Sequence, residues 1–171
     1  MSKTNKNEVT LNLEKQLRRN ISKMGTFICP EVTIGFNDAS KHGRVDILTI
    51  DTKGIARCYE VKSSVEDFKS KAKWSFVGHY NYFVCNSETY EQIKDDIPNG
   101  IGVYVDGYCK KKPKKQQVSD DMYKTILMSM IRSLSRDTDK LYKLDNPRAI
   151  EQYESTIERL RRENYRLRKN K

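Results

Sequence analysis

Two runs of strand-forming residues, joined by a four-residue turn, constrain the fold of this chain more than any other feature. Residues 45–50 and 55–62 are rich in valine, isoleucine and other strand formers, and residues 51–54 (Asp-Thr-Lys-Gly) have the composition of a tight turn. The pattern predicts a β-hairpin. Its pairing then places Asp46 of the first strand roughly opposite Tyr59 and Glu60 of the second.

Ionic side chains interrupt the apolar strands of this hairpin. Glu60 and Lys62 fall on one face near a strand end, where ionic groups cost free energy unless they are paired or coordinated. Asp46 and Glu60, at ~5–6 Å on adjacent strands, can share one hard divalent cation, Mg²⁺ or Mn²⁺, and the Val61 carbonyl is a natural further ligand. Lys62 can then orient water or neutralise charge on a phosphate. The alternative interpretation is a buried ion pair with a polar neighbour.

Two further triplets share the acid-x-lysine spacing of Glu60-Val-Lys62, and they begin at Asp51 and Asp67. Asp51 belongs to the predicted turn, and Asp67 belongs to the start of a predicted helix. Both are ordinary positions for a charged residue. Only the triplet at Glu60 therefore indicates chemistry.

The segments around the hairpin alternate between helical and strand patterns. Helices are predicted over 8–24, 64–79 and 87–95, and strands over 27–36, 82–85 and 101–105. The order of these segments predicts an α/β sandwich with a mixed sheet flanked by helices. Trp74 is interpreted as a packing residue rather than as a platform for base stacking.

The C-terminal third carries helical patterns of a different kind. Ser119 caps a helix with one apolar face, residues 136–148 are polar and are interpreted as a linker, and residues 149–171 carry a basic heptad seam. The seam consists of Ile150, Tyr153, Ile157, Leu160, Asn164 and Leu167. An asparagine in such a seam favours a parallel two-stranded coiled coil, and so a homodimer through 149–171. A helix that folds back on its own chain, or one that lies along DNA, is the alternative.

Charge is distributed unevenly along the chain. The net charge is +10, yet residues 29–106 hold nine basic and twelve acidic groups, and residues 107–171 hold eighteen and nine. An acidic centre with basic flanks suits carboxylates that hold a metal and lysines that bind the phosphates of DNA. Simple solubility is the alternative explanation.

Cysteine spacing and hydropathy exclude other classes of protein. The four cysteines form no CxxC pair and have no neighbouring histidine, which argues against a zinc site. Neither a signal peptide nor an apolar run long enough to cross a membrane occurs. We therefore expect a soluble cytoplasmic protein without a membrane partner.

Beyond these patterns, the chain resembles the MmcB-like family of the PD-(D/E)xK nuclease superfamily over about residues 8–135. The resemblance rests on Arg44-Val-Asp46, Glu60-Val-Lys62-Ser-Ser64, Asp67-Phe68, Lys73-Trp74, Tyr82-Phe-Val84 and Pro98-x-Gly-Ile-Gly-Val103. One departure is Val45, which stands where the superfamily usually has proline before the aspartate.

The resemblance implies a restriction-endonuclease-like domain over 1–135 and metal-dependent hydrolysis of DNA, in repair or nucleic-acid processing. It implies metal binding at Asp46 and Glu60, a catalytic role for Lys62, and a further catalytic glutamate on the first helix, for which Glu14 has the best spacing. A DNA-binding accessory protein that keeps the fold without cleavage is the alternative. DNA contacts are expected at Arg44, Lys73, Lys110, Lys111, Lys112, Lys114 and Lys115.

Overall fold

The computed structural model describes residues 7–35, 42–70, 74–144 and 147–169. Within them lie helices α1 (Glu8–Ile21), α3 (Val65–Lys69), α4 (Ser87–Ile93), α5 (Asp120–Leu144) and α6 (Pro147–Lys169). The strands are β1 (Thr26–Thr33), β2 (Arg44–Asp51), β3 (Ala56–Val61), β4 (Tyr80–Cys85), β5 (Gly102–Val105) and β6 (Tyr108–Lys111). The chain divides into two compact units, residues 1–133 and 134–171.

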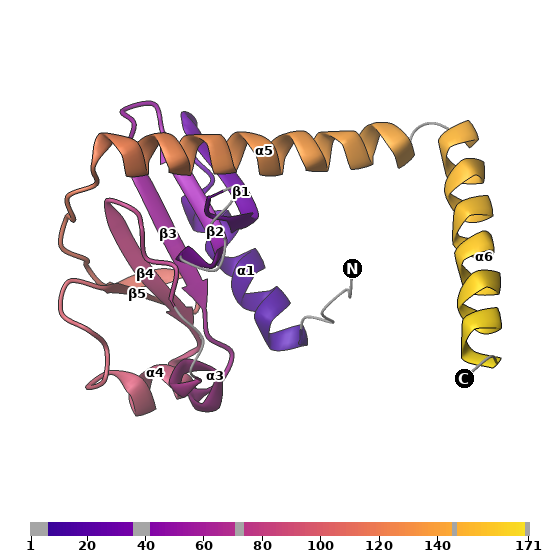
Figure 1. Ribbon diagram of the computed structural model, residues 1–171. Coiled ribbons are helices and arrows are strands. Elements are labelled where there is room, and N and C mark those ends of the chain that lie inside the picture. The colour runs from indigo at the N-terminus through magenta and orange to yellow at the C-terminus, as the bar shows by residue number, and fades with distance from the viewer. Residues whose placement is uncertain (1–6, 36–41, 71–73, 145–146, 170–171) are drawn as a thin grey trace. The chain divides into compact units, whose positions relative to one another are not determined.

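The strands of the first unit form one mixed sheet in the order β1-β2-β3-β4-β5-β6. β3 pairs in parallel with β4, and β4 pairs in parallel with β5, whereas the neighbouring pairs on either side are antiparallel (Figure 1). The parallel pairing brings the carboxyl ends of β3, β4 and β5 to the same edge of the sheet. This architecture confirms the predicted α/β fold with a mixed sheet flanked by helices.

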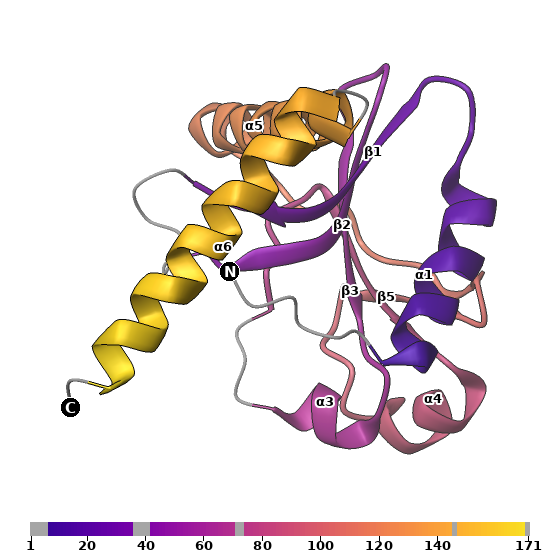
Figure 2. The same cartoon turned by 90° about the vertical axis from the view of Figure 1, so that its right-hand side faces the viewer.

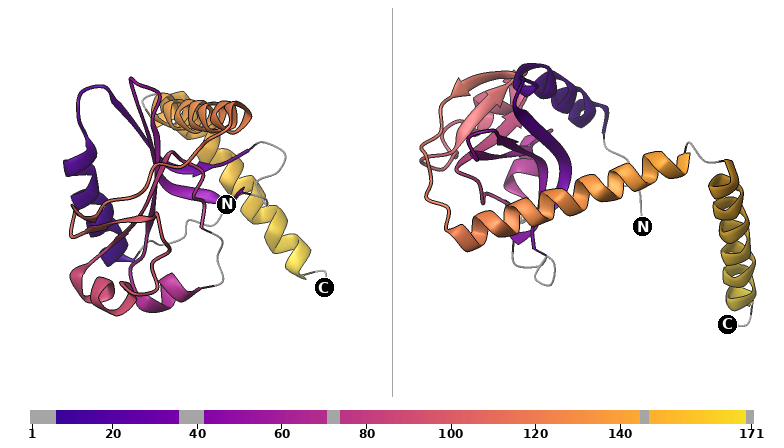
Figure 3. Two further views of the ribbon diagram at one scale, coloured as in Figure 1. Left: turned by 90° about the vertical axis from the view of Figure 1, so that its left-hand side faces the viewer. Right: turned by 90° about the horizontal axis from the view of Figure 1, so that it is seen from above.

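The two faces of the sheet are covered by different helices. Leu13, Leu17 and Ile21 of α1 are buried against one face, together with side chains of β2, β3 and β4. The start of α5 covers β1 to β3 on the other face, and α3 and α4 cover β4 and β5 beside it. Figures 2 and 3 show α1 and α5 on opposite sides of the sheet. Full burial of one such aliphatic side chain contributes about 1.5–3 kcal/mol, so the apolar stripe of α1 suffices to hold this helix on the sheet.

Local capping explains where α1 begins and ends. The Asn7 side chain accepts a hydrogen bond from the Val9 N–H at 2.6 Å, which satisfies one of the donors exposed at a helix start. The helix ends at Ile21, three residues before the predicted end at Met24. Gly25 follows with a φ of +78°, and its carbonyl accepts from the Thr52 N–H at 2.9 Å. Because this left-handed conformation favours glycine, the turn into β1 depends on that residue.

Two elements between β3 and α5 differ from the sequence-based predictions. The helix predicted over 64–79 is only Val65–Lys69, and residues 74–79 are not helical. Two hydrogen bonds hold that segment against β4 instead. The side-chain amide of Asn81 accepts from the Gly78 N–H and donates to the Gly78 carbonyl. Residues 110–115, whose lysine-rich composition predicts a basic loop, begin instead as strand β6, because Val103 and Val105 of β5 supply a partner ladder.

The C-terminal helices also depart from expectation. α5 continues through Leu144, so that most of the segment interpreted as a linker is helical, while residues 145–146 lie outside the described residues. Its polar composition is compatible with a helix because the second half of α5 is solvent-exposed. Among the described residues, no helix is both long and apolar enough to cross a membrane.

Candidate active site

The hairpin register places the first carboxylate of the candidate site. Ile47 of β2 pairs with Tyr59 of β3, so Asp46 lies one position further along, beside Glu60 and Val61. The Asp46 carboxylate accepts a hydrogen bond from the Val61 N–H at 2.8 Å. This bond fixes Asp46 at the end of β3, as the sequence pattern predicted.

Glu60 is the most unusual acidic residue of the site. Its side chain is only 6% exposed, and its Oε1 accepts a hydrogen bond from the Ser75 N–H at 3.1 Å. Burial, followed by the negative charge of Asp46, raises the pKa of Glu60 to about 8, although the Ser75 N–H and the Lys62 ammonium oppose the shift. A carboxyl group whose ionised form is disfavoured both by burial and by a second negative charge is a candidate functional group.

Lys62 lies directly after β3 and is 5% exposed. Its backbone N–H donates to the Val84 carbonyl at 2.8 Å, which continues the parallel pairing with β4. Its Nζ lies 3.5 Å from Oδ1 of Asp67, whose other oxygen accepts from the Ser63 N–H at 3.1 Å. The ammonium is therefore kept at the same edge of the sheet as Glu60.

Two residues that contact the site were not predicted from the sequence. Asp67 was interpreted as an ordinary helix-start charge, although Asp67-Phe68 is one of the motifs of the family resemblance and Asp67 lies five residues after Lys62. Ser75 holds Glu60 through its backbone N–H, a role that any residue except proline could fill. No sequence signal points to it.

Glu14, the glutamate predicted from the first helix, is half-buried. It lies on α1, which packs on the opposite face of the sheet from Glu60. The charges that act on Glu60 come from Asp46, Lys62 and Asp67. The hydrogen bonds and charges described here join the hairpin residues, and the catalytic role of Glu14 stays a prediction.

The donor set fits a hard divalent cation with few protein ligands. Among the described residues, no group of three or more His, Cys, Asp or Glu side chains could hold a metal. Asp46 and Glu60 nevertheless supply two carboxylates whose negative charges act on each other. Mg²⁺ is usually held by one or two carboxylates, with waters and substrate phosphate oxygens completing the octahedron. Val61, whose carbonyl was predicted as a further ligand, follows Glu60 directly.

The predicted DNA-binding residues are spread along the domain. Arg44 is half-exposed and forms an ion pair with Glu31 at 3.4 Å, and Lys73 lies outside the described residues. The lysine-rich segment is mostly exposed and consists of Lys110, Lys111, Lys112, Lys114 and Lys115. Two backbone hydrogen bonds anchor its end: the Lys114 N–H donates to the Gly100 carbonyl, and the Gln116 N–H donates to the His79 carbonyl.

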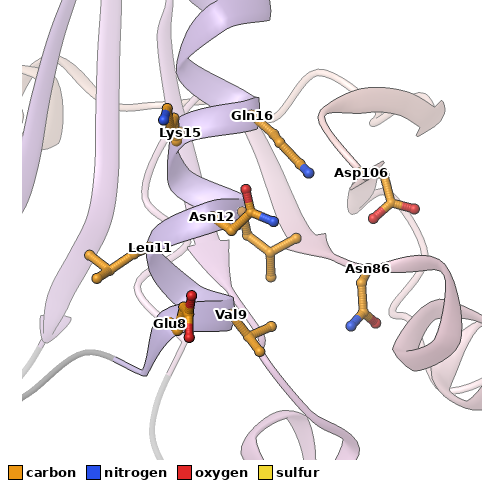
Figure 4. A pocket seen from close by; sticks show the side chains of 9 residues that line it. Glu8, Val9, Leu11, Asn12, Lys15, Gln16, Asn86 and Asp106 are labelled. Atoms are coloured by element: carbon orange, nitrogen blue, oxygen red, sulfur yellow. The ribbon is translucent and has the colours of Figure 1, made fainter.

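A separate hollow of about 560 Å³ lies between α1 and the ends of β4 and β5. Figure 4 shows the side chains of Gln16, Asn86 and Asp106 around it. Asn86 caps α4 through the Thr89 N–H, and Asp106 accepts from the Ser87 N–H and hydroxyl. These side chains therefore hold local structure, and the hollow contains none of the hairpin residues.

Comparisons with known proteins agree with this architecture. A solved structure of a protein of unknown function from Silicibacter pomeroyi matches 83% of this chain and 94% of its own, with a TM-score of 0.63 and 19% identity. At that identity the likeness shows the fold alone. No curated protein matches the chain. The family model described as "DNA repair protein MmcB-like" matches residues 1–135, most of the chain. This protein therefore belongs to the MmcB-like family of DNA repair proteins.

Proposed function

We propose that this protein is a divalent-metal-dependent nuclease that hydrolyses phosphodiester bonds in DNA during repair. The observation that supports it most is the burial of Glu60 and Lys62 beside Asp46 at one sheet edge. Burying ionic groups is unfavourable unless they are paired or coordinated. An evolved fold keeps such an arrangement where the charges serve a reaction.

Each residue has a distinct part in the proposed reaction. Asp46 and Glu60 would hold Mg²⁺ or Mn²⁺, which supplies an activated water and stabilises charge on the phosphate when bound. The Asp46 bond to the Val61 N–H and the Glu60 bond to the Ser75 N–H orient the two carboxylates before any cation arrives. Lys62, positioned by Asp67, neutralises the charge that develops on the phosphate oxygens.

The direct test is DNA cleavage by the full chain. Single-stranded, duplex and branched DNA are incubated with Mg²⁺, with Mn²⁺ or with EDTA, and the products are separated by denaturing electrophoresis. We expect cleavage with either metal and none with EDTA. DNA binding without cleavage under every condition would instead support the accessory-protein alternative, which the lysine-rich segment favours by its charge.

DNA binding is proposed to depend on the lysine-rich segment 110–115. Lysine side chains bind phosphates and carry no base information, so replacing all five lysines with glutamate should weaken binding equally on unrelated sequences. The slope of log affinity against log salt should also become shallower by ~0.9 for each duplex phosphate that is no longer neutralised. An unchanged slope would show that this segment does not touch the DNA backbone.

We further propose that α6 forms a parallel homodimer. Tyr153, Ile157, Leu160 and Leu167 follow heptad spacing and are all exposed in the single chain, while the side chain of Ile150 lies outside the described residues. Burial of the apolar area of this seam by a partner helix stabilises the dimer by ~25 cal/mol per Å². The arginine-rich remainder of the helix opposes association, so we expect micromolar affinity.

Sedimentation of the full chain tests this dimer. Ile157→Asp places a charge in the seam and should give a monomer, whereas Ser155→Asp, on the opposite side of the helix, should leave the dimer intact. Wild-type protein that stays monomeric at high concentration would exclude the coiled coil and leave a helix that docks on its own chain or on phosphate.

A further inference from the structure

A cleft of about 680 Å³ lies beside the candidate active site on the same side of the sheet. One wall is formed by the segment of Trp74 and Phe76, and a second wall is formed by Gln116, Gln117 and Val118, just after the lysine-rich segment. Asn99 also lines the cleft. The residue after Trp74 is Ser75, whose N–H holds Glu60, so the wall of the cleft and the site are consecutive in sequence.

Trp74 combines tight packing with access to solvent. Its ring lies 5.1 Å from the ring of Phe83 and 5.6 Å from that of Phe68, in the core of the domain. The residue is nonetheless 36% exposed. The predicted packing role is thus only part of its setting, because a surface of the indole stays available beside the cleft.

The walls of the cleft are held by hydrogen bonds before any ligand arrives. Asn81 is buried and ties Gly78 through both its N–H and its carbonyl, at 3.0 Å each. His79 Nδ1 accepts from the Ala56 N–H at 3.1 Å, and its carbonyl accepts from the Gln116 N–H at 2.8 Å. The last of these bonds crosses from one wall to the other. A preorganised cleft loses little conformational entropy when it binds a ligand.

The chemistry of the lining matches one class of ligand. An indole offers a stacking surface for a flat ring, side-chain amides offer both donors and acceptors for its polar edge, and neighbouring lysines suit the phosphates on either side. The interior of a base-paired duplex presents no such free base. We propose that this cleft binds an unpaired nucleobase of DNA, so that the protein selects single-stranded or gapped DNA over intact duplex.

This proposal rests on the proposed function for its substrate, but it can be tested without cleavage. Trp74 is the only tryptophan of a chain with ten tyrosines, so fluorescence excited at a wavelength that tyrosine does not absorb reports on Trp74. Full-length protein in EDTA is titrated with a ten-nucleotide thymidine strand, an abasic strand of equal length, a blunt duplex, and a duplex with a one-nucleotide gap. We expect quenching by the thymidine strand and the gapped duplex, and little by the other two.

Variants test the two walls separately, with fluorescently labelled DNA and anisotropy. Trp74→Leu should weaken binding of the thymidine strand about tenfold, the size expected when one base–aromatic stack is removed. Phe27→Leu, a change at an exposed aromatic residue of β1, should leave binding unchanged. Gln117→Glu should weaken binding more than Gln92→Glu, which adds the same charge on the exposed surface of α4. The glutamate variants also cover the case in which Trp74→Leu fails to fold.

The outcomes separate this proposal from the nuclease assignment. Equal quenching by abasic and thymidine strands, or equal effects of Gln117→Glu and Gln92→Glu, would overturn the cleft as a base site even if duplex DNA is cut. Selective quenching, with no DNA cleavage in the presence of either metal, would support the cleft as a base-binding site and contradict the proposed nuclease activity.

Discussion

The β2–β3 hairpin carries charged residues at both ends, and the two ends differ in what the charges do. At the turn end, Asp51 accepts hydrogen bonds from the Lys53 and Ile55 N–H groups at 3.0 Å and from Arg57 at 2.9 Å. At the other end, Glu60 is buried beside Asp46. The turn charges stabilise the fold locally, whereas the far charges are unfavourable for folding.

The pKa values of the two acids move in opposite directions for the same reason. Burial disfavours ionisation of Asp51, but hydrogen bonds from the Ile55 N–H and Arg57 outweigh it and lower the pKa. At Glu60, burial and the Asp46 charge outweigh the opposing Ser75 N–H and raise the pKa to about 8. The balance between hydrogen-bond donors and burial therefore distinguishes the two carboxylates. Donors outweigh burial at the structural Asp51, and burial outweighs them at the candidate functional Glu60.

The largest effect should come from matched lysine variants at the two ends. Lys62→Met removes the cation at the proposed phosphate site and should lower the rate of DNA cleavage at least about 100-fold. Lys53→Met, at the turn, should leave the rate unchanged. Initial rates with Mn²⁺ measure both, and far-UV circular dichroism checks that each variant is folded. Wild-type cleavage by Lys62→Met would remove the catalytic lysine from the mechanism.

Substitution of the two aspartates of β2 should have different effects on metal binding. Asp46→Asn removes one of the two proposed ligands and should abolish the heat of Mn²⁺ binding in titration calorimetry. Asp51→Asn keeps both ligands and should bind the metal like the wild type. Equal heats from both variants would mean that Asp46 is not a ligand.

Stability in EDTA should change in opposite directions at the two ends. Glu60→Gln keeps an oxygen that can accept from the Ser75 N–H and removes the repulsion by Asp46, so we expect a gain of about 1 kcal/mol. Asp51→Asn removes a charged acceptor of three hydrogen bonds and should lose about 2 kcal/mol at pH 7. Urea denaturation measures both changes, and a loss at Glu60→Gln would show that its charge stabilises the fold.

The smallest effect concerns how the turn responds to acid. Because the pKa of Asp51 is lower in the folded state, its contribution to stability is fully present above the ordinary value of about 4 and declines as the pH falls through the lower folded value. The difference between wild type and Asp51→Asn should therefore shrink at pH 3 and below. A difference that stays constant from pH 7 to pH 2 would contradict the ionic role of Asp51.

Local sequence was enough to determine the elements that depend on near neighbours. The hairpin, its register at Asp46, the apolar stripe of α1 and the strands β4 and β5 all follow from short-range periodicity and turn chemistry. The same information brought Asp46, Glu60 and Lys62 together. These residues are held by adjacent strands of one hairpin, so no distant segment was needed to place them.

Tertiary structure decided the features that depend on segments far apart in the chain. Helical periodicity continued to His79, but the ties of residues 75–79 to the sheet replaced the second half of that helix. Long-range packing likewise placed α1 on the opposite face of the sheet from Glu60. Pairing with β5 made Lys110 and Lys111 part of strand β6. Hydrogen bonds from Ser75 and across to Gln116 join residues 15 to 37 positions apart. Periodicity records only local preference, so the buried environment of Glu60 and the cleft at Trp74 appear only when the chain is folded.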